Sequence, residues 1–446
     1  MAGVSTRPIL PGAPVARPGA QAWIVLAVLC FVYVLNFLDR QLLSILAKPI
    51  QDELGVSDGQ LGLLGGLYFA MFYCILAIPV GWLADRTNRV KVLAFSCALW
   101  SAATAACGLA SNYPQLALAR MSVGVGEAGG VPPSYAIISD YFPQGTRGTA
   151  LSLFNMGPPI GQALGVAFGA SIAAAYSWRL AFIWVGVIGL VTAAAVWFFV
   201  REPKRGGLDA RPVDATPADT MAAVIPAKSG FWSTCRMFFA DPVLLRVALA
   251  CAATQFITYA TMNFSVLFLM REKGMALDDV AVWYALVVLV GVGAGMLASG
   301  RLVDRLVPRG KAAYAYVPAA GLVLAVPLFL GFIWAPGWPL ALAFLLLPMG
   351  LNYFYLSPAV TLVQEEVRPD QRVLAGALLL LVMNLVGLGL GPTYLGFASD
   401  LFRPTHPDTS LQMAFYTLVP FYGVAIGLFL WLAKALKQQG RKEATP

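Results

Sequence analysis

The chain has 446 residues, of which 59% are hydrophobic and only 12% are charged, with a formal net charge of +8. Soluble domains carry about 25% charged residues, so this composition excludes an ordinary soluble protein and predicts an integral membrane protein. The basic residues gather in alternate loops, which explains the net charge without nucleic-acid binding. The sequence has no G-x-x-x-x-G-K-[ST] motif and no His/Asp, Ser/Lys or HExxH arrangement. An ATP-driven pump and an intramembrane enzyme are therefore both disfavoured.

Twelve apolar runs are long enough to cross a bilayer as helices, because a span needs about 20 residues. They cover residues 22–46, 60–84, 90–110, 114–138, 147–175, 179–200, 243–270, 279–302, 312–334, 338–362, 372–398 and 411–435. The runs are continuous and lack the alternation of a transmembrane barrel. We therefore expect an all-α membrane protein with 12 transmembrane helices in two six-helix bundles.

The polar segments between and around these runs divide the chain into five parts. We expect a disordered cytoplasmic tail at 1–20, an N-terminal bundle at 21–201, a cytoplasmic linker at 202–238, a C-terminal bundle at 239–436 and a basic tail at 437–446. Five basic residues remain for the other side: Lys48, Arg179, Arg271, Lys273 and Arg403. Because cytoplasmic loops carry the excess of Lys and Arg, both termini are predicted to be cytoplasmic, in the cell inner membrane.

Three ionisable residues lie inside predicted spans: Asp39 in the first, and Arg120 and Glu127 in the fourth. A charge at bilayer depth costs at least about 2.5–3.5 kcal/mol, so such residues usually face a water-filled path. The helical rise places Asp39 roughly 25 Å from the cytoplasmic start of its helix, and Arg120 roughly 9 Å below the opposite surface. One cavity can therefore present all three side chains. We expect Arg120 to alternate between Asp39 and Glu127 and so couple transport to protons; a permanent structural ion pair is the alternative.

Other candidates for substrate contact surround this group. Arg40 is either an anion-binding residue or an arginine that extends to the membrane surface, and Asn36 is either a cavity-lining or a packing residue. The C-terminal half has no ionisable residue at mid-depth, and its candidates are Tyr259, Asn263, Phe354 and Tyr355. A cavity charged on one side and mostly apolar on the other favours an amphiphile with an ionic head, although aromatic residues at such spacing are often ordinary packing.

An internal repeat relates the two halves. The sequence Gly81-Trp-Leu-Ala-Asp85-Arg86-Thr-Asn-Arg89 follows the second run, and Gly300-Arg-Leu-Val-Asp304-Arg305 follows the eighth. Parallel six-helix repeats are the architecture of the major facilitator superfamily, whose substrate site lies between the halves. The first copy resembles the G-x-L-a-D-R-x-x-R-[RK] loop signature of that superfamily.

The resemblance extends to a narrower group. Arg120-Met-Ser-Val-Gly124-Val-Gly126-Glu127-Ala128 resembles the fourth-helix signature of the superfamily, with a glutamate added. Together with Asn36-Phe-Leu-Asp39-Arg40, it is similar to the spinster lipid transporters and their bacterial homologues, and also to the organic anion:proton symporters. The resemblance implies a cytoplasmic gate or latch formed by Gly81, Asp85, Arg86, Arg89, Asp304 and Arg305.

We therefore predict a proton-coupled secondary transporter of an anionic-headed amphiphile that works by alternating access. An organic anion:proton symporter, for a sugar acid or carboxylate, and a multidrug efflux antiporter are the alternatives. No cofactor is expected beyond protons as the coupling ion, and we expect a monomer whose partners are the lipid bilayer and a small substrate. The six cysteines form no disulfide framework or metal-ligand spacing.

Overall fold

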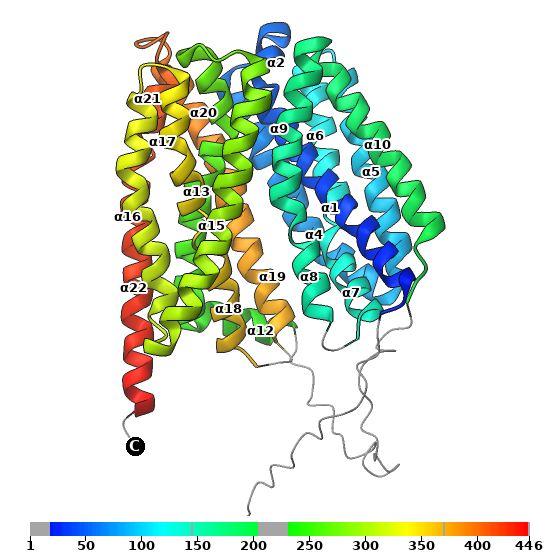
Figure 1. The fold of residues 1–446 in the computed structure, drawn as a ribbon, viewed down its shortest axis with the longest axis vertical. Coiled ribbons are helices and arrows are strands. Elements are labelled where there is room, and N and C mark those ends of the chain that lie inside the picture. The colour runs from blue at the N-terminus through cyan, green and yellow to red at the C-terminus, as the bar shows by residue number, and fades with distance from the viewer. Residues whose placement is uncertain (1–17, 144–145, 204–230, 369–370, 445–446) are drawn as a thin grey trace, which may run out of the picture.

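The computed structural model describes residues 18–143, 146–203, 231–368 and 371–444, without the side chains of residues 85, 373 and 440–444. Every regular element in these residues is a helix. Figure 1 shows two groups of helices side by side, one coloured blue to green and the other green to red. The predicted all-α architecture is confirmed.

The N-terminal group begins with a helix that contributes two charged residues to the site described below. Its elements are α1 (Ala20–Ile45), α2 (Ala47–Leu54), α3 (Asp58–Gly65), α4 (Leu67–Arg86), α5 (Arg89–Leu109), α6 (Tyr113–Glu127), α7 (Val131–Tyr141), α8 (Arg147–Phe154), α9 (Gly157–Ala175) and α10 (Trp178–Phe199). The backbones of α1 and α9 approach closely, since a Cβ atom at Gly165 would lie 2.7 Å from the carbonyl oxygen of Leu38.

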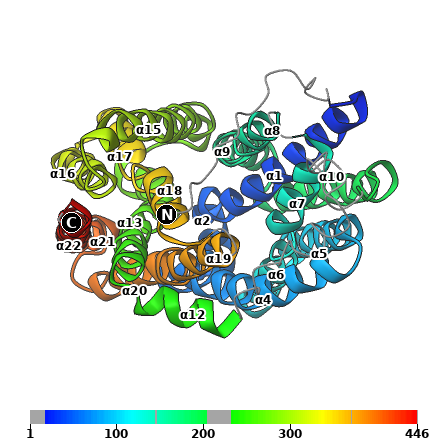
Figure 2. The same ribbon diagram turned by 90° about the horizontal axis from the view of Figure 1, so that it is seen from below.

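The C-terminal group begins with a short helix that lies mostly within the predicted linker. Its elements are α12 (Phe231–Ala240), α13 (Pro242–Lys273), α14 (Leu277–Asp279), η1 (Val280–Tyr284), α15 (Ala285–Leu306), η2 (Val307–Arg309), α16 (Ala313–Trp334), α17 (Trp338–Leu351), α18 (Leu356–Glu366), α19 (Arg372–Met383), η3 (Asn384–Leu390), α20 (Gly391–Phe402), α21 (Ser410–Tyr416) and α22 (Val419–Ala444). In the view along the bundle, α12 runs across the page beside α19 and α20 (Figure 2). The tail predicted at 437–446 is helical as far as Ala444, and residues 1–17 and 204–230 lie outside the described part.

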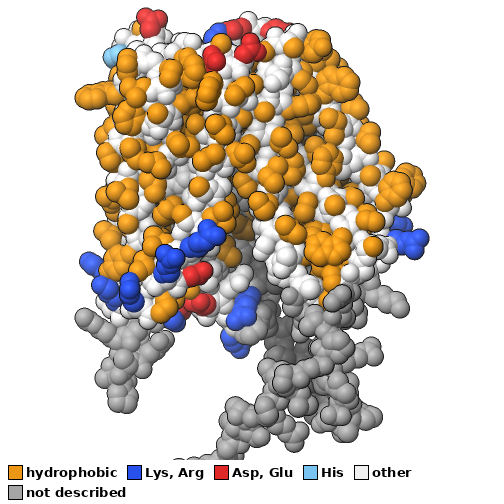
Figure 3. All heavy atoms as spheres, in the orientation of Figure 1, with side chains coloured by type: hydrophobic (Ala, Val, Ile, Leu, Met, Phe, Trp, Pro, Cys, Tyr) orange, Lys and Arg blue, Asp and Glu red, His pale blue; other side chains and the backbone are white. Residues whose placement is uncertain are grey.

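Eleven stretches of the described residues are long and apolar enough to cross a membrane by length and composition. The predicted span at 114–138 is not among them, and residues 128–130 divide it into α6 and α7. The side chain of Asn112 accepts a hydrogen bond from the backbone of Gln115 at 3.0 Å and so caps the start of α6. Figure 3 shows that apolar side chains cover the middle of one face, whereas charged side chains gather at its two ends.

The two halves meet most closely at the end that carries α2, α3 and α20, which we call the closed end. There, a Cβ atom at Gly62 would lie 2.5 Å from the carbonyl oxygen of Pro392. Thr393 donates its hydroxyl to the carbonyl of Gly62 at 3.2 Å and accepts from the backbone N–H of Leu67 at 3.2 Å. The opposite end, where α10 ends and α12 begins, is called the linker end.

Candidate functional site

Two buried ion pairs cross between α1 and α6 in the middle of the N-terminal half. A guanidinium nitrogen of Arg120, Nη1, lies 3.5 Å from Oδ2 of Asp39, and both side chains are buried. Arg40 makes the second pair, because its Nε and Nη2 atoms each lie 2.7 Å from Oε2 of Glu127. Adjacent residues of a helix point about 100° apart, which is why Asp39 and Arg40 have different partners. Sequence analysis did not predict the pairing of Arg40 with Glu127.

Aromatic rings separate and surround the two arginines. The guanidinium carbon of Arg40 lies 4.9, 5.0 and 4.9 Å from the ring centres of Phe37, Phe69 and Tyr73. The guanidinium carbon of Arg120 also lies near Phe69, 5.6 Å from its ring centre. Rings within about 6 Å of a cation attract it through the negative faces of their π systems. Phe69 therefore contacts both cations, and neither arginine depends on water alone for its solvation.

A cavity between the two halves opens onto this cluster. Its lining comes from α1, α3, α4 and α6 on one side and from α13 and η3 on the other: Arg40, Gln41, Ser44, Gly65, Phe69, Arg120, Tyr259, Met262, Asn263 and Leu388. Ser44 closes it toward α13, because its hydroxyl lies 2.9 Å from the carbonyl oxygens of Met262 and Asn263. All charges in this lining come from the N-terminal half.

The structure separates the predicted substrate contacts. Arg40, Tyr259 and Asn263 line the cavity between the halves, as a shared substrate site requires. Asn36 lines a second cavity, which lies wholly within the N-terminal half. Phe354 and Tyr355 line neither cavity; Tyr355 is buried and donates its hydroxyl to Gln255 at 3.2 Å.

Several buried atoms of the charged cluster have no hydrogen-bond partner. These atoms are both carboxylate oxygens of Asp39, Oε1 of Glu127, and Nε and Nη1 of Arg120. Buried polar groups are almost always paired with protein or ordered water, so each of these atoms calls for a further partner. A protonated carboxyl group, water or a bound anion could each supply them. Among the described residues, no group of three or more His, Cys, Asp and Glu side chains could hold a metal.

A second ionic network, which sequence analysis missed, joins the halves at the closed end. Arg271 donates from Nη1 and Nη2 to the two oxygens of Asp58 at 2.9 and 2.8 Å. Asp400 accepts hydrogen bonds from the backbone N–H groups of Asp58 and Gly59 at 3.1 and 2.8 Å. The signal available in the sequence was opposite charges at the same end of three predicted spans, but Arg271 was read only as an outer-loop residue.

The predicted latch residues lie at the linker end. Arg89 pairs with Asp140 at 2.7 Å, and both belong to the N-terminal half. Arg86 lies 4.0 Å from the ring centre of Trp82, and Asp304 and Arg305 are exposed. A Cβ atom at Gly81 would meet open space, and the side chain of Asp85 lies outside the described part. Among the described residues, the ion pair that joins the halves is at the closed end.

These features define a class: a membrane protein of two helix bundles with a charged cavity between them. The family model described as Major Facilitator Superfamily matches residues 29–392. The chain belongs to the major facilitator superfamily, and it is therefore a multi-pass membrane transporter of small substrates and not an enzyme. The predicted family and its twelve-helix fold are confirmed.

Individual relatives narrow the resemblance. An MFS-type efflux pump of Mycolicibacterium smegmatis is 32% identical over 417 residues, which cover 93% of each protein. The sphingosine-1-phosphate transporter of Mus musculus is 28% identical over 92% of this chain and 76% of that protein. The hexuronate transporter of Bacillus subtilis is 26% identical over 84% of this chain and 88% of that protein.

A solved structure shows the same arrangement. The crystal structure of a bacterial homologue of the human lysosomal transporter spinster, in an inward-facing and unoccupied conformation, has a TM-score of 0.84. It is 28% identical and covers 94% of this chain and 98% of that chain. The predicted resemblance to bacterial spinster homologues is confirmed.

Proposed function

We propose that this chain is a proton-coupled secondary transporter that moves an anionic-headed amphiphile by alternating access. The observation that carries the proposal is the pair of arginines in the cavity lining, Arg40 and Arg120, each held by one buried carboxylate of the same half. The cluster is neutral as long as both carboxylates are ionised. Any proton that binds there leaves an arginine without its counter-charge.

The chemistry follows from this balance. A proton on Glu127 removes the negative charge from the oxygen that accepts from Arg40, and the free guanidinium then favours an anionic headgroup. Loss of the proton restores the Arg40–Glu127 pair and expels the headgroup. Proton and anion therefore bind most favourably together, and the loaded and empty states differ in their preferred conformation. The predicted exchange of Arg120 between Asp39 and Glu127 stays a prediction, since Arg120 contacts Asp39 in this conformation.

The opposite wall supports an amphiphile. Tyr259, Met262 and Leu388 present aromatic and aliphatic surface without a charge, which suits an acyl chain better than a hydrated sugar. The similarity to a sphingosine-1-phosphate transporter supports the same choice. The similarity to a hexuronate transporter keeps a sugar acid as the second candidate, and an efflux antiporter remains the third.

The proposed orientation places the linker end and both termini in the cytoplasm, in the cell inner membrane, with residues 21–201 and 239–436 as the two moving halves. The joined closed end then faces outward, which agrees with the similarity to an inward-facing structure. Single cysteines placed in 205–230 should react with an impermeant maleimide only after the membrane is opened. Reaction in intact cells would reverse the proposed orientation.

Transport in liposomes tests the function directly. The purified protein would be reconstituted around a trapped pH-sensitive dye and supplied with a fluorescent lysophospholipid or with glucuronate. We expect saturable lysolipid movement accompanied by a change in internal pH, and no such change in protein-free liposomes. Saturable glucuronate transport that competing lysolipid does not inhibit would replace the amphiphile with the sugar acid. Lysolipid movement without proton movement would refute proton coupling.

A further inference from the structure

The fourth and tenth spans are interrupted at matching positions in the two halves. In the fourth, α6 ends at Glu127 and α7 begins at Val131. In the tenth, α17 ends at Leu351 and α18 begins at Leu356. A membrane helix can be broken at depth only where its freed backbone groups are buried in protein or line a water-filled cavity. A serine hydroxyl donates to a carbonyl at each break, from Ser134 to Gly130 at 2.8 Å in the fourth span, but the breaks differ in their side chains.

The break in the C-terminal half is filled by its own side chains. Its residues are Asn352, Tyr353, Phe354 and Tyr355, three of them aromatic. Ser299 donates its hydroxyl to the carbonyl of Phe354 at 2.6 Å, and Asn352 donates to the hydroxyl of Tyr422 at 3.0 Å. The carbonyl of Phe354 and the side-chain nitrogen of Asn352 therefore find partners within the protein, whereas Oδ1 of Asn352 has none.

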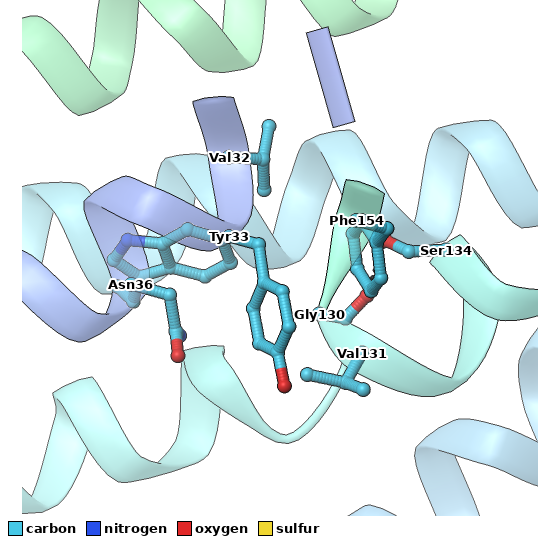
Figure 4. Close-up of a pocket in the computed structure, with 8 residues that line it drawn as sticks. Val32, Tyr33, Asn36, Gly130, Val131, Ser134 and Phe154 are labelled. Carbon is cyan, nitrogen blue, oxygen red and sulfur yellow. Dashed lines mark hydrogen bonds between the residues drawn. The ribbon is translucent and has the colours of Figure 1, made fainter. Parts of the chain in front are cut away.

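The break in the N-terminal half consists of Ala128, Gly129 and Gly130, which carry a methyl group or no side chain. A cavity lies against it, lined by Val32, Tyr33, Asn36, Trp100, Gly130, Val131, Ser134 and Phe154. Figure 4 shows side chains from α1, α7 and α8 around this space. Asn36 is only 3% exposed, and its Oδ1 atom has no hydrogen-bond partner.

Unpartnered acceptors continue from this cavity into the charged cluster. Asp39 follows Asn36 by three residues on α1, so both lie on one face of that helix. Both carboxylate oxygens of Asp39, one of them in the ion pair with Arg120, and Oε1 of Glu127 are buried without hydrogen-bond partners, and Glu127 directly precedes the break. A buried water needs two to four polar partners, and acceptor atoms of this kind provide them.

We infer that the break in the fourth span is a hydrated port that delivers protons to Glu127 and Asp39. This inference rests on the proposed proton coupling. A hydronium ion in the port transfers its proton to Oε1 of Glu127; an O–H bond forms there, a water molecule remains, and the neutral carboxyl group no longer holds Arg40 as an ion pair. The titratable and charged groups that face Glu127 are Asp39 and Arg40 on α1, Arg120 on α6 and Tyr259 on α13, and Tyr73 on α4 faces Arg40.

X-ray radiolysis of the full-length protein in detergent tests for the water itself, because hydroxyl radicals formed from bound water oxidise the side chains beside it. Trp100 beside the port and Tyr355 beside the filled break are matched in burial, at 2% and 3% exposed. After correction for the intrinsic reactivity of each residue type, Trp100 should be oxidised about tenfold faster, as expected if water lies at only one break. Asn36→Leu should remove most of this difference. Equal rates in the wild type would overturn the port.

Transport by Asn36→Leu separates a proton port from a substrate contact. With fluorescent lysophospholipid in liposomes, we expect about a tenfold slower proton-coupled rate, an increased solvent isotope effect in D₂O, and a dissociation constant within about twofold of wild type. Asn352→Leu at the other break is the matched control and should leave the isotope effect unchanged. Ser134→Ala offers a second variant of the port if Asn36→Leu does not fold.

The remaining outcomes are also decisive. A weakened affinity with an unchanged isotope effect would make Asn36 a substrate contact and overturn the port. A wild type that transports lysolipid without protons would refute the proposed function, whereas the oxidation of Trp100 would still report whether the cavity holds water.

Discussion

The two halves share a fold but divide the polar chemistry of the cavity unequally. The N-terminal half carries four ionisable side chains in two buried pairs, Asp39–Arg120 and Arg40–Glu127. Near the corresponding depth, the C-terminal half has neutral hydrogen bonds, such as that from Gln255 to Asn384 at 2.8 Å. Neutral networks keep their hydrogen bonds over a wide pH range, whereas carboxylates exchange protons. One half is therefore suited to titrate, and the other to form a constant wall.

This inequality has an energetic basis. Burying an ion pair brings little net stability, because desolvation offsets most of the attraction, but removing one partner typically costs about 3–5 kcal/mol. Two such pairs in one half are therefore poor devices for holding helices together and sensitive devices for detecting a proton or an anion.

Neutralising the carboxylates should have the largest effect. Glu127→Gln and Asp39→Asn remove a titrating group without removing bulk, and proton-driven transport should fall by about 100-fold or more. At least one of them should retain measurable substrate exchange. The comparison is Gln255→Met in the other half, which should keep its dependence on the proton gradient. Full proton-coupled transport in both carboxylate variants would show that the charged half does not titrate.

Changing Arg120 should have the next largest effect. Arg120→Lys keeps the charge but loses the planar guanidinium that lies over Phe69, and transport should fall by roughly 10–100-fold. Arg120→Leu should also lower the melting temperature, because Asp39 is left as an unpaired buried charge. Adding Asp39→Asn should recover part of that loss in a double-mutant cycle. Wild-type transport by Arg120→Lys would mean that the position needs only a positive point charge.

The closed end offers an ion pair shared between the halves. Asp58→Asn weakens the two contacts with Arg271 and should shift the population toward a state open at this end by about tenfold. Distances between spin labels on α3 and α20 would measure the shift. Asp52→Asn, which weakens the exposed pair with Lys48, is the matched control and should change little. An unchanged distance distribution would mean that backbone contacts such as Gly62 against Pro392 hold this end alone.

Much of the fold follows from the sequence because hydrophobic length is the strongest signal in a membrane protein. The apolar runs predicted α1, α5, α10 and α16 to within a few residues. The broken fourth span was not foreseen, although Gly129-Gly130 and Pro132-Pro133 lie within it, because apolar composition does not show where a helix is interrupted. The short helix α12 was hidden for a similar reason, since the predicted linker was judged by its polar composition.

The charged site was less predictable than the fold. Placing Asp39, Arg120 and Glu127 in apolar runs identified the cluster, because charges at depth are rare. The pairing was not accessible, because whether Arg40 contacts Glu127 or lipid depends on the rotation of α1 against α6. The ion pair between Asp58 and Arg271 was missed because it joins residues from different halves. The internal repeat in the sequence also gives no information about which end of the two bundles is closed.

The smallest expected effect tests the neutral wall and separates the two substrate classes. Tyr259 lines the cavity from the C-terminal half, and Tyr259→Phe removes only its hydroxyl, so lysolipid transport should change by about two- to fivefold at most. Tyr284→Phe is a matched control, because Tyr284 is buried in the same half and lines neither cavity. Introducing a charge at the wall with Tyr259→Glu should impair transport of a substrate with an acyl chain much more strongly. Arg40→Ala provides the comparison. If the substrate is a sugar acid held by its carboxylate, Arg40→Ala should reduce transport more than any substitution in the wall, because it removes a charge-assisted contact. If Tyr259→Glu is tolerated while Arg40→Ala abolishes glucuronate transport, the wall receives no acyl chain and the substrate is a compact anion.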